Sequence, residues 1–119
     1  MGTPQHLRIE QDGPVTVAFL VDSLLIDRSM VLELSDELLQ FINAERPQRL
    51  LLSFRDVTRF GTESINVLLR ARNAVAAYGG QIRLCAMPNG IREAFRILRL
   101  DGTVFPILES TADAVANFS

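Results

Sequence analysis

One short polar segment carries most of the groups in this chain that could do chemistry. It runs from Arg55 to Ser64 (RDVTRFGTES) and connects a predicted strand to a predicted helix. In open α/β sheets, ligands and regulatory groups gather at such strand-to-helix edges. Thr62 stands at the predicted helix N-cap, where free backbone N–H groups and the helix dipole favour an anion. Thr62 is therefore a candidate phosphoacceptor, and a phosphate there would add roughly −1.5 to −2 charges. The plainer alternative is a hydroxyl that only caps the helix, contributing about 1 kcal/mol.

The same segment does not predict a catalytic site. Asp56 and Glu63 are two carboxylates, but no base, nucleophile or metal-ligand spacing accompanies them. We interpret Asp56 as a turn residue and Glu63 as a first-turn charge that favours the helix dipole. Gly61 is a single loop glycine and not a glycine-rich phosphate-binding motif.

Composition excludes several further classes of function. The chain has 119 residues, a formal net charge of −2, one cysteine and one histidine. We expect His6 to lie in a fraying N-terminal segment and Cys85 to be a small buried hydrophobe, so no catalytic triad, metal site or cofactor is predicted. All 12 basic residues are arginine, which excludes Schiff-base chemistry and a Walker-type phosphate loop.

The partner is not expected to be a nucleic acid or a membrane. The net charge gives no global basic field of the kind that a sequence-independent nucleic-acid binder needs. No apolar run approaches 18 residues, and the N-terminus has no signal-peptide hydrophobic stretch. We therefore expect a cytoplasmic protein.

The hydrophobic periodicity predicts one α/β domain over residues 1–119, with its core at about 6–118. An opening hairpin turns at Asp12-Gly13-Pro14, and the apolar run Leu50-Leu51-Leu52 is typical of a central strand covered on both faces. The expected order is β-β-α-β-α-β-α-β-α, with a mostly parallel sheet and four helices. The helices are expected to begin at Asp27 or Ser29, near Thr62, after Pro88 and at Ser110.

Two helices present polar stripes. On the helix over residues 62–78, the polar stripe consists of Glu63, Asn66, Arg70 and Asn73. On the next helix, Arg92, Arg96 and Arg99 follow at spacings of four and three residues. This basic stripe is either a solvated face or a docking patch for an acidic partner.

From Leu50 onward, the order of short motifs resembles one known family. The stretch LLLSFRDVTRFGTESINVLLRARNAVAAYGGQIRLCAM, followed by PNGIREAFRILRLDGTVFPILESTADAV, resembles the strands, loop and helices of STAS domains. This is the sulfate-transporter and anti-sigma-factor-antagonist family. The resemblance covers about Val15 to Phe118.

The resemblance implies a function of regulated protein binding rather than catalysis. In the family, a serine-kinase anti-sigma factor binds the domain and phosphorylates a Ser or Thr at the start of the second helix, and Thr62 occupies that position. The acid that usually precedes it is Gly61 here, and Glu63 and Ser64 replace the small residues that follow. The candidate partner-binding residues are Arg59, Phe60, Gly61, Thr62, Glu63, Ser64, Asn66, Arg70 and Asn73. Glu63 could also act as a fixed, partial mimic of the phosphate.

Two other functions stay open at this point. The domain could be a constitutive scaffold that self-associates without a phosphate switch, which suits the altered residues around Thr62. A small-molecule or nucleotide binder is the third possibility, because the loop lies at the C-terminal edge of a strand. The oligomeric state is not predicted.

Overall fold

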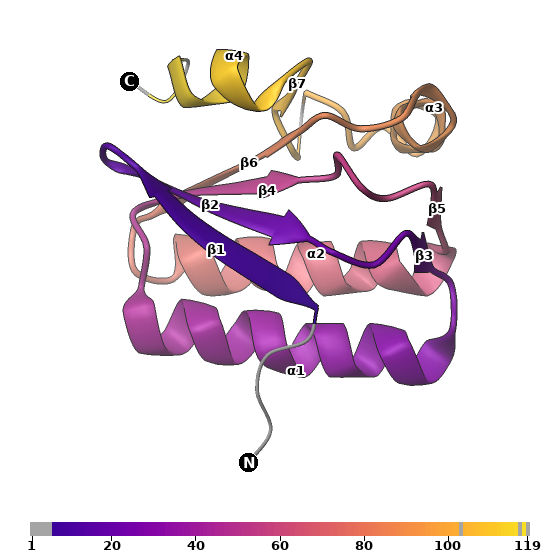
Figure 1. Ribbon diagram of the computed structural model, residues 1–119, viewed down its shortest axis with the longest axis horizontal. Helices are drawn as coiled ribbons and strands as arrows, with labels where there is room; N and C mark the ends of the chain where they lie inside the picture. Colours follow the sequence, from indigo (N-terminus) through magenta and orange to yellow (C-terminus); the bar gives the residue numbers. More distant parts are fainter. Residues whose placement is uncertain (1–5, 103, 117, 119) are drawn as a thin grey trace.

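The computed structural model describes residues 6–102, 104–116 and 118, and these form three layers (Figure 1). A central sheet has α1 and α2 on one side and α4 on the other, and α3 lies at the end of the molecule near β5, with its buried residues in the same core cluster as those of α1 and α2. The helices are α1 (Arg28–Glu45), α2 (Thr62–Ala76), α3 (Asn89–Ile97) and α4 (Thr111–Ala116). The strands are β1 (Leu7–Asp12), β2 (Val15–Leu20), β3 (Leu24–Leu25), β4 (Arg49–Ser53), β5 (Arg59–Phe60), β6 (Gln81–Cys85) and β7 (Ile107–Leu108).

The main sheet has the order β1-β2-β4-β6-β7. Only the opening hairpin is antiparallel, and β2, β4, β6 and β7 pair in parallel. The predicted α/β class with four helices and a mostly parallel sheet is therefore confirmed. Gly13 supplies the positive φ of 60° that the hairpin turn needs. Thr103 and Asn117, which fall within the span of the resemblance, lie outside the described residues.

The central strand β4 is buried on both faces, as its apolar run predicts. Leu50 and Leu52 pack into the larger core cluster, which includes buried residues of α1, α2 and α3. Leu51 points to the other face and packs with Phe19, Cys85 and residues of the C-terminal segment. Because successive strand side chains alternate between faces, one strand supports both cores. The burial of Cys85 is confirmed.

The structure adds one feature that the periodicity did not predict. The segment after β2 and the polar segment from Arg55 to Ser64 contain β3 and β5, which pair in parallel as a separate ribbon, with Leu24 opposite Arg59 and Leu25 opposite Phe60. Strands of two residues are too short to show a period-2 pattern. They form here because distant segments meet in the folded chain. The ribbon stands at one end of the molecule, beside the carboxyl end of the sheet (Figure 1).

Several element ends differ from expectation. Asp27 caps α1, as its side chain accepts from the N–H groups of Ser29 and Met30, so the alternative start at Ser29 is wrong. The helix α3 ends at Ile97, before the last arginine of the predicted basic stripe. The predicted cap of the last helix is confirmed, since Ser110 Oγ accepts from the N–H of Asp113.

His6 is the largest departure from the sequence prediction. It was expected in a fraying segment, but its residue surface is only 9% exposed, and its ring contacts two carboxylates. The prediction was wrong because those partners lie 16 and 27 residues further along the chain. Local sequence around residue 6 carries no sign of such distant contacts.

Candidate functional site

The β3–β5 ribbon holds the polar segment in place through backbone carbonyls. Ser23 O accepts from Thr58 N at 2.7 Å and from Arg59 N at 3.1 Å. Leu25 O accepts from Gly61 N at 2.9 Å and from Ser64 Oγ at 2.8 Å. These bonds connect the chain before α1 to the first turn of α2. They fix where α2 begins and which of its first side chains face solvent.

The first turn of α2 leaves Thr62 exposed. Gly61 is the N-cap in an extended conformation, and no side chain caps the helix. Thr62 is instead the first helical residue, so the prediction of Thr62 as N-cap was wrong, and so was the interpretation of its hydroxyl as only a cap. Glu63 follows as an exposed acidic residue in the first turn, where a negative charge is favoured by the helix dipole.

The other candidate contact residues differ in their exposure to solvent. The side chains of Asn66, Arg70 and Asn73 are exposed, in agreement with the predicted polar stripe, and Arg59 of β5 is exposed as well. Phe60 is half-buried, and its ring packs at 5.2 Å from that of Phe54 and at 6.1 Å from that of Phe95, measured between centroids. The Phe60 ring therefore packs partly against the core.

Ser64 does not belong to this surface. Its side chain is fully buried and donates to Leu25 O. A partner that docks on the folded domain cannot contact this hydroxyl. The prediction of Ser64 as a contact residue was wrong because helical periodicity did not show that β3 covers this side of the first turn.

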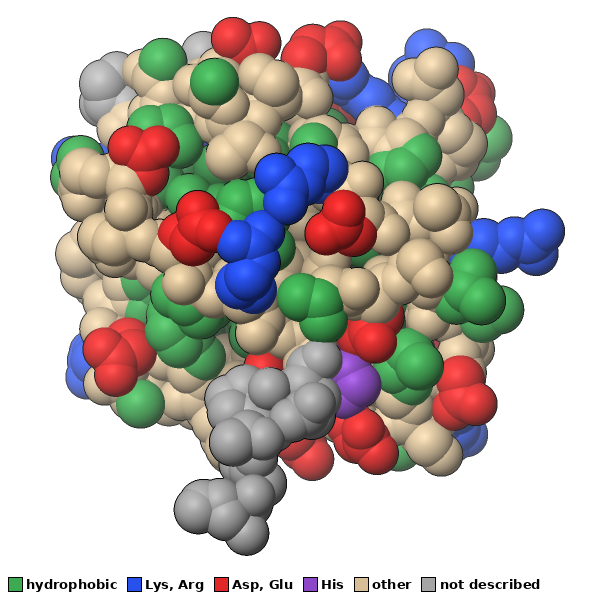
Figure 2. Space-filling model, viewed as in Figure 1, with side chains coloured by type: hydrophobic (Ala, Val, Ile, Leu, Met, Phe, Trp, Pro, Cys, Tyr) green, Lys and Arg blue, Asp and Glu red, His purple; other side chains and the backbone are tan. Residues whose placement is uncertain are grey.

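Two apolar residues that the sequence interpretation missed complete the surface. Leu24 is 47% exposed and Ile26 is 55% exposed. Ile26 lies directly against Gly61, since a Cβ added at Gly61 would be 3.5 Å from Ile26 Cα. Apolar side chains also lie beside a projecting basic side chain at the end of the molecule that carries β3 and β5 (Figure 2). The run Leu24-Leu25-Ile26 was the available signal, but nothing local distinguishes its one buried member from the two exposed ones.

We define this face as the α2 entrance. It comprises Leu24, Ile26, Arg59, Gly61, Thr62 and Glu63. It joins exposed apolar groups, a cation, an anion and a hydroxyl over a backbone held by the ribbon.

The basic stripe on the third helix is not a continuous cationic face. Arg92 Nε lies 3.5 Å from Asp101, and its Nη1 lies 3.3 Å from Glu109. Arg96 pairs with Glu93 of the same helix. Arg99 lies beyond the end of the helix in a left-handed conformation, with φ of 61°. Both interpretations of this stripe assumed three arginines on one helix face, and the structure contradicts that assumption.

Metal binding and thiol chemistry depend on side chains that the structure places as follows. Among them, no group of three or more His, Cys, Asp or Glu side chains is placed to hold a metal ion. Burial raises the pKa of the Cys85 thiol, and hydrogen bonds from Thr111 and Ser53 offset this only in part. A raised pKa leaves less of the reactive thiolate. In the described part of the chain, none of the helices is long and apolar enough to cross a membrane.

Comparison with known proteins defines the class to which this fold belongs. The family model described as "Mlab, STAS domain" matches residues 25–109, which run from the second residue of β3 through β7 and include the α2 entrance apart from Leu24. The chain therefore belongs to the STAS domain family. No curated protein matches the sequence.

Solved structures agree with this family at low sequence identity. An anti-sigma-factor antagonist (STAS) domain protein from Planctomyces limnophilus is 21% identical, with a TM-score of 0.82 over 95% of this chain and 97% of that one. An anti-sigma factor antagonist from Mycobacterium paratuberculosis is 19% identical, with a TM-score of 0.79 over 94% and 92% of the two chains. The phosphorylated form of the Bacillus cell fate determinant SpoIIAA is 14% identical, with a TM-score of 0.69 over 93% and 96%. At these identities the likeness shows a common fold.

Proposed function

We propose that this STAS domain is a cytoplasmic, non-enzymatic module that binds a protein partner of the anti-sigma-factor, serine-kinase class through the α2 entrance. One observation carries the proposal: an exposed threonine hydroxyl stands at a helix start that no side chain caps, beside exposed apolar residues. Among proteins with the same fold, several are named as anti-sigma factor antagonists.

We further propose Thr62 as the site where the partner adds phosphate. Its hydroxyl is exposed, and the partial positive charge of the α2 N-terminus would stabilise the added anion. The neighbouring Glu63 adds a competing negative charge. A phosphate at Thr62 would place like charges next to each other and change the affinity of this surface for a partner.

Partner binding is tested by removing the apolar part of the α2 entrance. The doubly substituted Leu24→Ala/Ile26→Ala protein should bind a serine-kinase anti-sigma factor at least about tenfold more weakly than wild type, which corresponds to about 1.4 kcal/mol. Leu32→Ala is the matched control, because Leu32 is 49% exposed on α1 outside this surface. Equal loss in the control, or no loss in the double variant, contradicts the proposed surface.

Phosphorylation is tested with the same kinase and ATP, and the phosphate is located by mass spectrometry. We expect phosphate on Thr62 in wild type and in Thr62→Ser, and none in Thr62→Ala. Thr16→Ala is the matched control, since Thr16 lies at the start of β2, away from the α2 entrance. Phosphate on another residue, or its absence with several kinases of this class, contradicts the assignment.

The role of Glu63 is tested separately. If its carboxylate acts as a partial phosphate mimic, Glu63→Gln and Glu63→Ala should both change partner affinity, because both remove the charge. Unchanged binding in both variants eliminates the mimic and leaves Thr62 unaffected.

A constitutive scaffold remains the second candidate, and the exposed Leu24 and Ile26 favour it as much as they favour a kinase. In that case the mass in solution exceeds that of one chain, and Thr62→Ala leaves the assembly unchanged. A small-molecule or nucleotide ligand is the third candidate. It would appear as thermal stabilisation, about 2.7 kcal/mol at a concentration 100 times its dissociation constant.

A further inference from the structure

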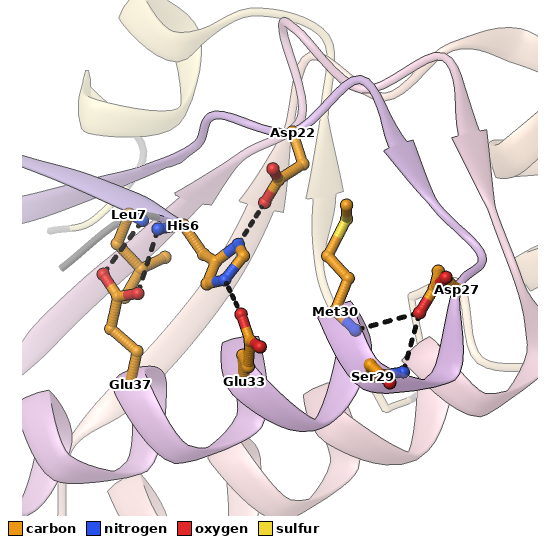
Figure 3. Close-up of polar contacts among 8 residues, drawn as sticks. All are labelled: His6, Leu7, Asp22, Asp27, Ser29, Met30, Glu33 and Glu37. Atoms are coloured by element: carbon orange, nitrogen blue, oxygen red, sulfur yellow. Dashed lines mark hydrogen bonds and ion pairs between the residues drawn. The ribbon is translucent and has the colours of Figure 1, made fainter. Parts of the chain in front are cut away.

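A single histidine lies between acidic side chains from two parts of the molecule. His6 directly precedes β1, and its ring lies between Asp22, on the connection from β2 to β3, and Glu33 of α1 (Figure 3). Nδ1 lies 2.6 Å from Asp22 Oδ2, and Nε2 lies 2.9 Å from Glu33 Oε1. Figure 2 shows the histidine among acidic side chains.

The geometry favours one protonation state of the ring. A neutral imidazole has one N–H donor and one bare nitrogen, whereas an ionised carboxylate can only accept. Both contacts are hydrogen bonds to ionised carboxylates at the same time only when both nitrogens carry a hydrogen, so this arrangement favours the imidazolium form of His6. Burial by itself lowers the pKa of His6, but the hydrogen bonds to Asp22 and Glu33 and the charges of Asp22 and Glu37 outweigh it, so the pKa is raised above 6.5.

The third carboxylate near the ring fixes the backbone. Glu37 of α1 accepts from the N–H of His6 at 2.9 Å and from the N–H of Leu7 at 3.0 Å (Figure 3). The ionisable groups that face the ring are therefore Asp22 on one side and Glu33 and Glu37 of α1 on the other. Loss of the proton from His6 leaves three carboxylates around a neutral ring.

The residues that follow Asp22 in the chain form hydrogen bonds to the backbone of the α2 entrance. Asp22 precedes Ser23, whose carbonyl accepts from Thr58 and Arg59. Two residues further on, Leu25 O accepts from Gly61 N and from Ser64 Oγ. The chain from Asp22 to Leu25 thus joins the histidine to the backbone beneath Thr62.

We propose that His6 is a proton-dependent clamp that ties Asp22 to α1 and thereby holds the β3–β5 ribbon and the α2 entrance in place. With the proton bound, one ring joins β1, the β2–β3 connection and α1. When the proton leaves, only one of Asp22 and Glu33 keeps a donor, and the ribbon is held less firmly. The effect on partner affinity rests on the proposed function, but the clamp itself does not.

The direction of the pH effect follows from the raised pKa. The stabilisation from His6 is fully present below pH 6.5, and it is lost as the pH rises through the higher pKa of the folded protein. The clamp therefore weakens as the pH rises through the pKa of His6 in the folded protein.

The titration of His6 tests the clamp directly, because NMR of the ring reports one histidine. We expect a midpoint above 6.5 in wild type that moves toward 6.5 in Asp22→Asn and in Glu33→Gln. The Glu33 side chain is 68% exposed, so its substitution leaves the fold intact even if Asp22→Asn does not fold. Asp36→Asn, an exposed carboxylate on the same helix, is the control and should leave the midpoint unchanged. A midpoint at or below 6.5 in wild type overturns the proposal.

Amide hydrogen exchange tests the connection to the α2 entrance without any partner. After correction for intrinsic rates, protection of the Arg59 and Gly61 amides should fall between pH 6 and pH 8 in wild type. In His6→Gln, which cannot titrate, protection should not change over this range. Identical profiles in the two proteins overturn the coupling. Because neither measurement uses a kinase, failure of the clamp and failure of Thr62 phosphorylation are distinguished.

Discussion

The helices α1 and α2 begin in different ways. Asp27 closes the start of α1 with its own carboxylate, which accepts from Ser29 N at 2.8 Å and from Met30 N at 3.3 Å. At the start of α2, Gly61 has no side chain to accept such bonds. The start of α2 is fixed from outside, by Leu25 of the neighbouring ribbon. A helix start that is held by the fold rather than by its own cap leaves its first side chains available to a partner.

The absence of a side-chain cap does not by itself identify a binding site. The third helix also begins without a cap bond, at Pro88. The α2 entrance differs because the exposed apolar Leu24 and Ile26 border it and because an exposed hydroxyl and carboxylate stand in its first turn. The α2 entrance is therefore defined by two features together, which are the hydrogen bonds from the ribbon to the start of α2 and the exposed residues around that start.

Removing a hydrogen bond between α2 and the ribbon should have the largest effect on the free energy of unfolding. We expect Ser64→Ala to lower the free energy of unfolding by about 1–2 kcal/mol, because a buried hydrogen bond to Leu25 O is lost. Chemical denaturation measures this. Thr62→Ala is the matched control two residues earlier, and its exposed hydroxyl should change stability by less than about 0.5 kcal/mol. Equal effects from the two hydroxyls would show that α2 is not held by the ribbon.

Removing the cap of α1 should have the next largest effect. Asp27→Ala takes away the acceptor of two backbone N–H groups, and we expect a loss of about 1 kcal/mol. Asp27→Asn keeps an acceptor and should recover most of this loss, which excludes a purely electrostatic cause. If Asp27→Ala is as stable as wild type in denaturant titrations, the two helix starts do not differ energetically.

The smallest effect should come from giving α2 a cap like that of α1. Gly61 has φ of −82° and ψ of 165°, which other residues adopt, and an added Cβ would make only ordinary contacts with Ile26. We therefore expect Gly61→Asp to raise stability by a few tenths of a kcal/mol. Gly61→Ala, which adds the Cβ without an acceptor, is the control. Clear destabilisation by both would mean that the glycine is required by the backbone, which would weaken the comparison.

Much of the fold could be predicted because its signals are local. The apolar run at Leu50-Leu51-Leu52 marked the central strand, and the spacing after Asp27 marked a long helix with its cap. The exposed stripe of α2 followed from the same periodicity. These features need only neighbouring residues, since helix and strand periods are set by backbone geometry.

The candidate site could be predicted only in part. Thr62 was placed at the start of the right helix, but its neighbours were misjudged, as Ser64 is buried and Leu24 and Ile26 are exposed. The reason is that β3 and β5 lie far apart in the sequence and meet only in the folded chain. Arg92 shows the same difficulty, because its partner Glu109 is 17 residues away in the sequence.

The sequence by itself determined the order of the helices and of the strands of the main sheet, the central strand and the position of one hydroxyl at a helix start. Only the tertiary structure decided which side chains surround that hydroxyl, and that His6 lies between Asp22 and Glu33. The physical reason is the range of the contacts. Periodicity and capping act over one or two turns of chain, whereas the hydrogen bond from Ser64 to Leu25 spans 39 residues and exists only once the layers have packed.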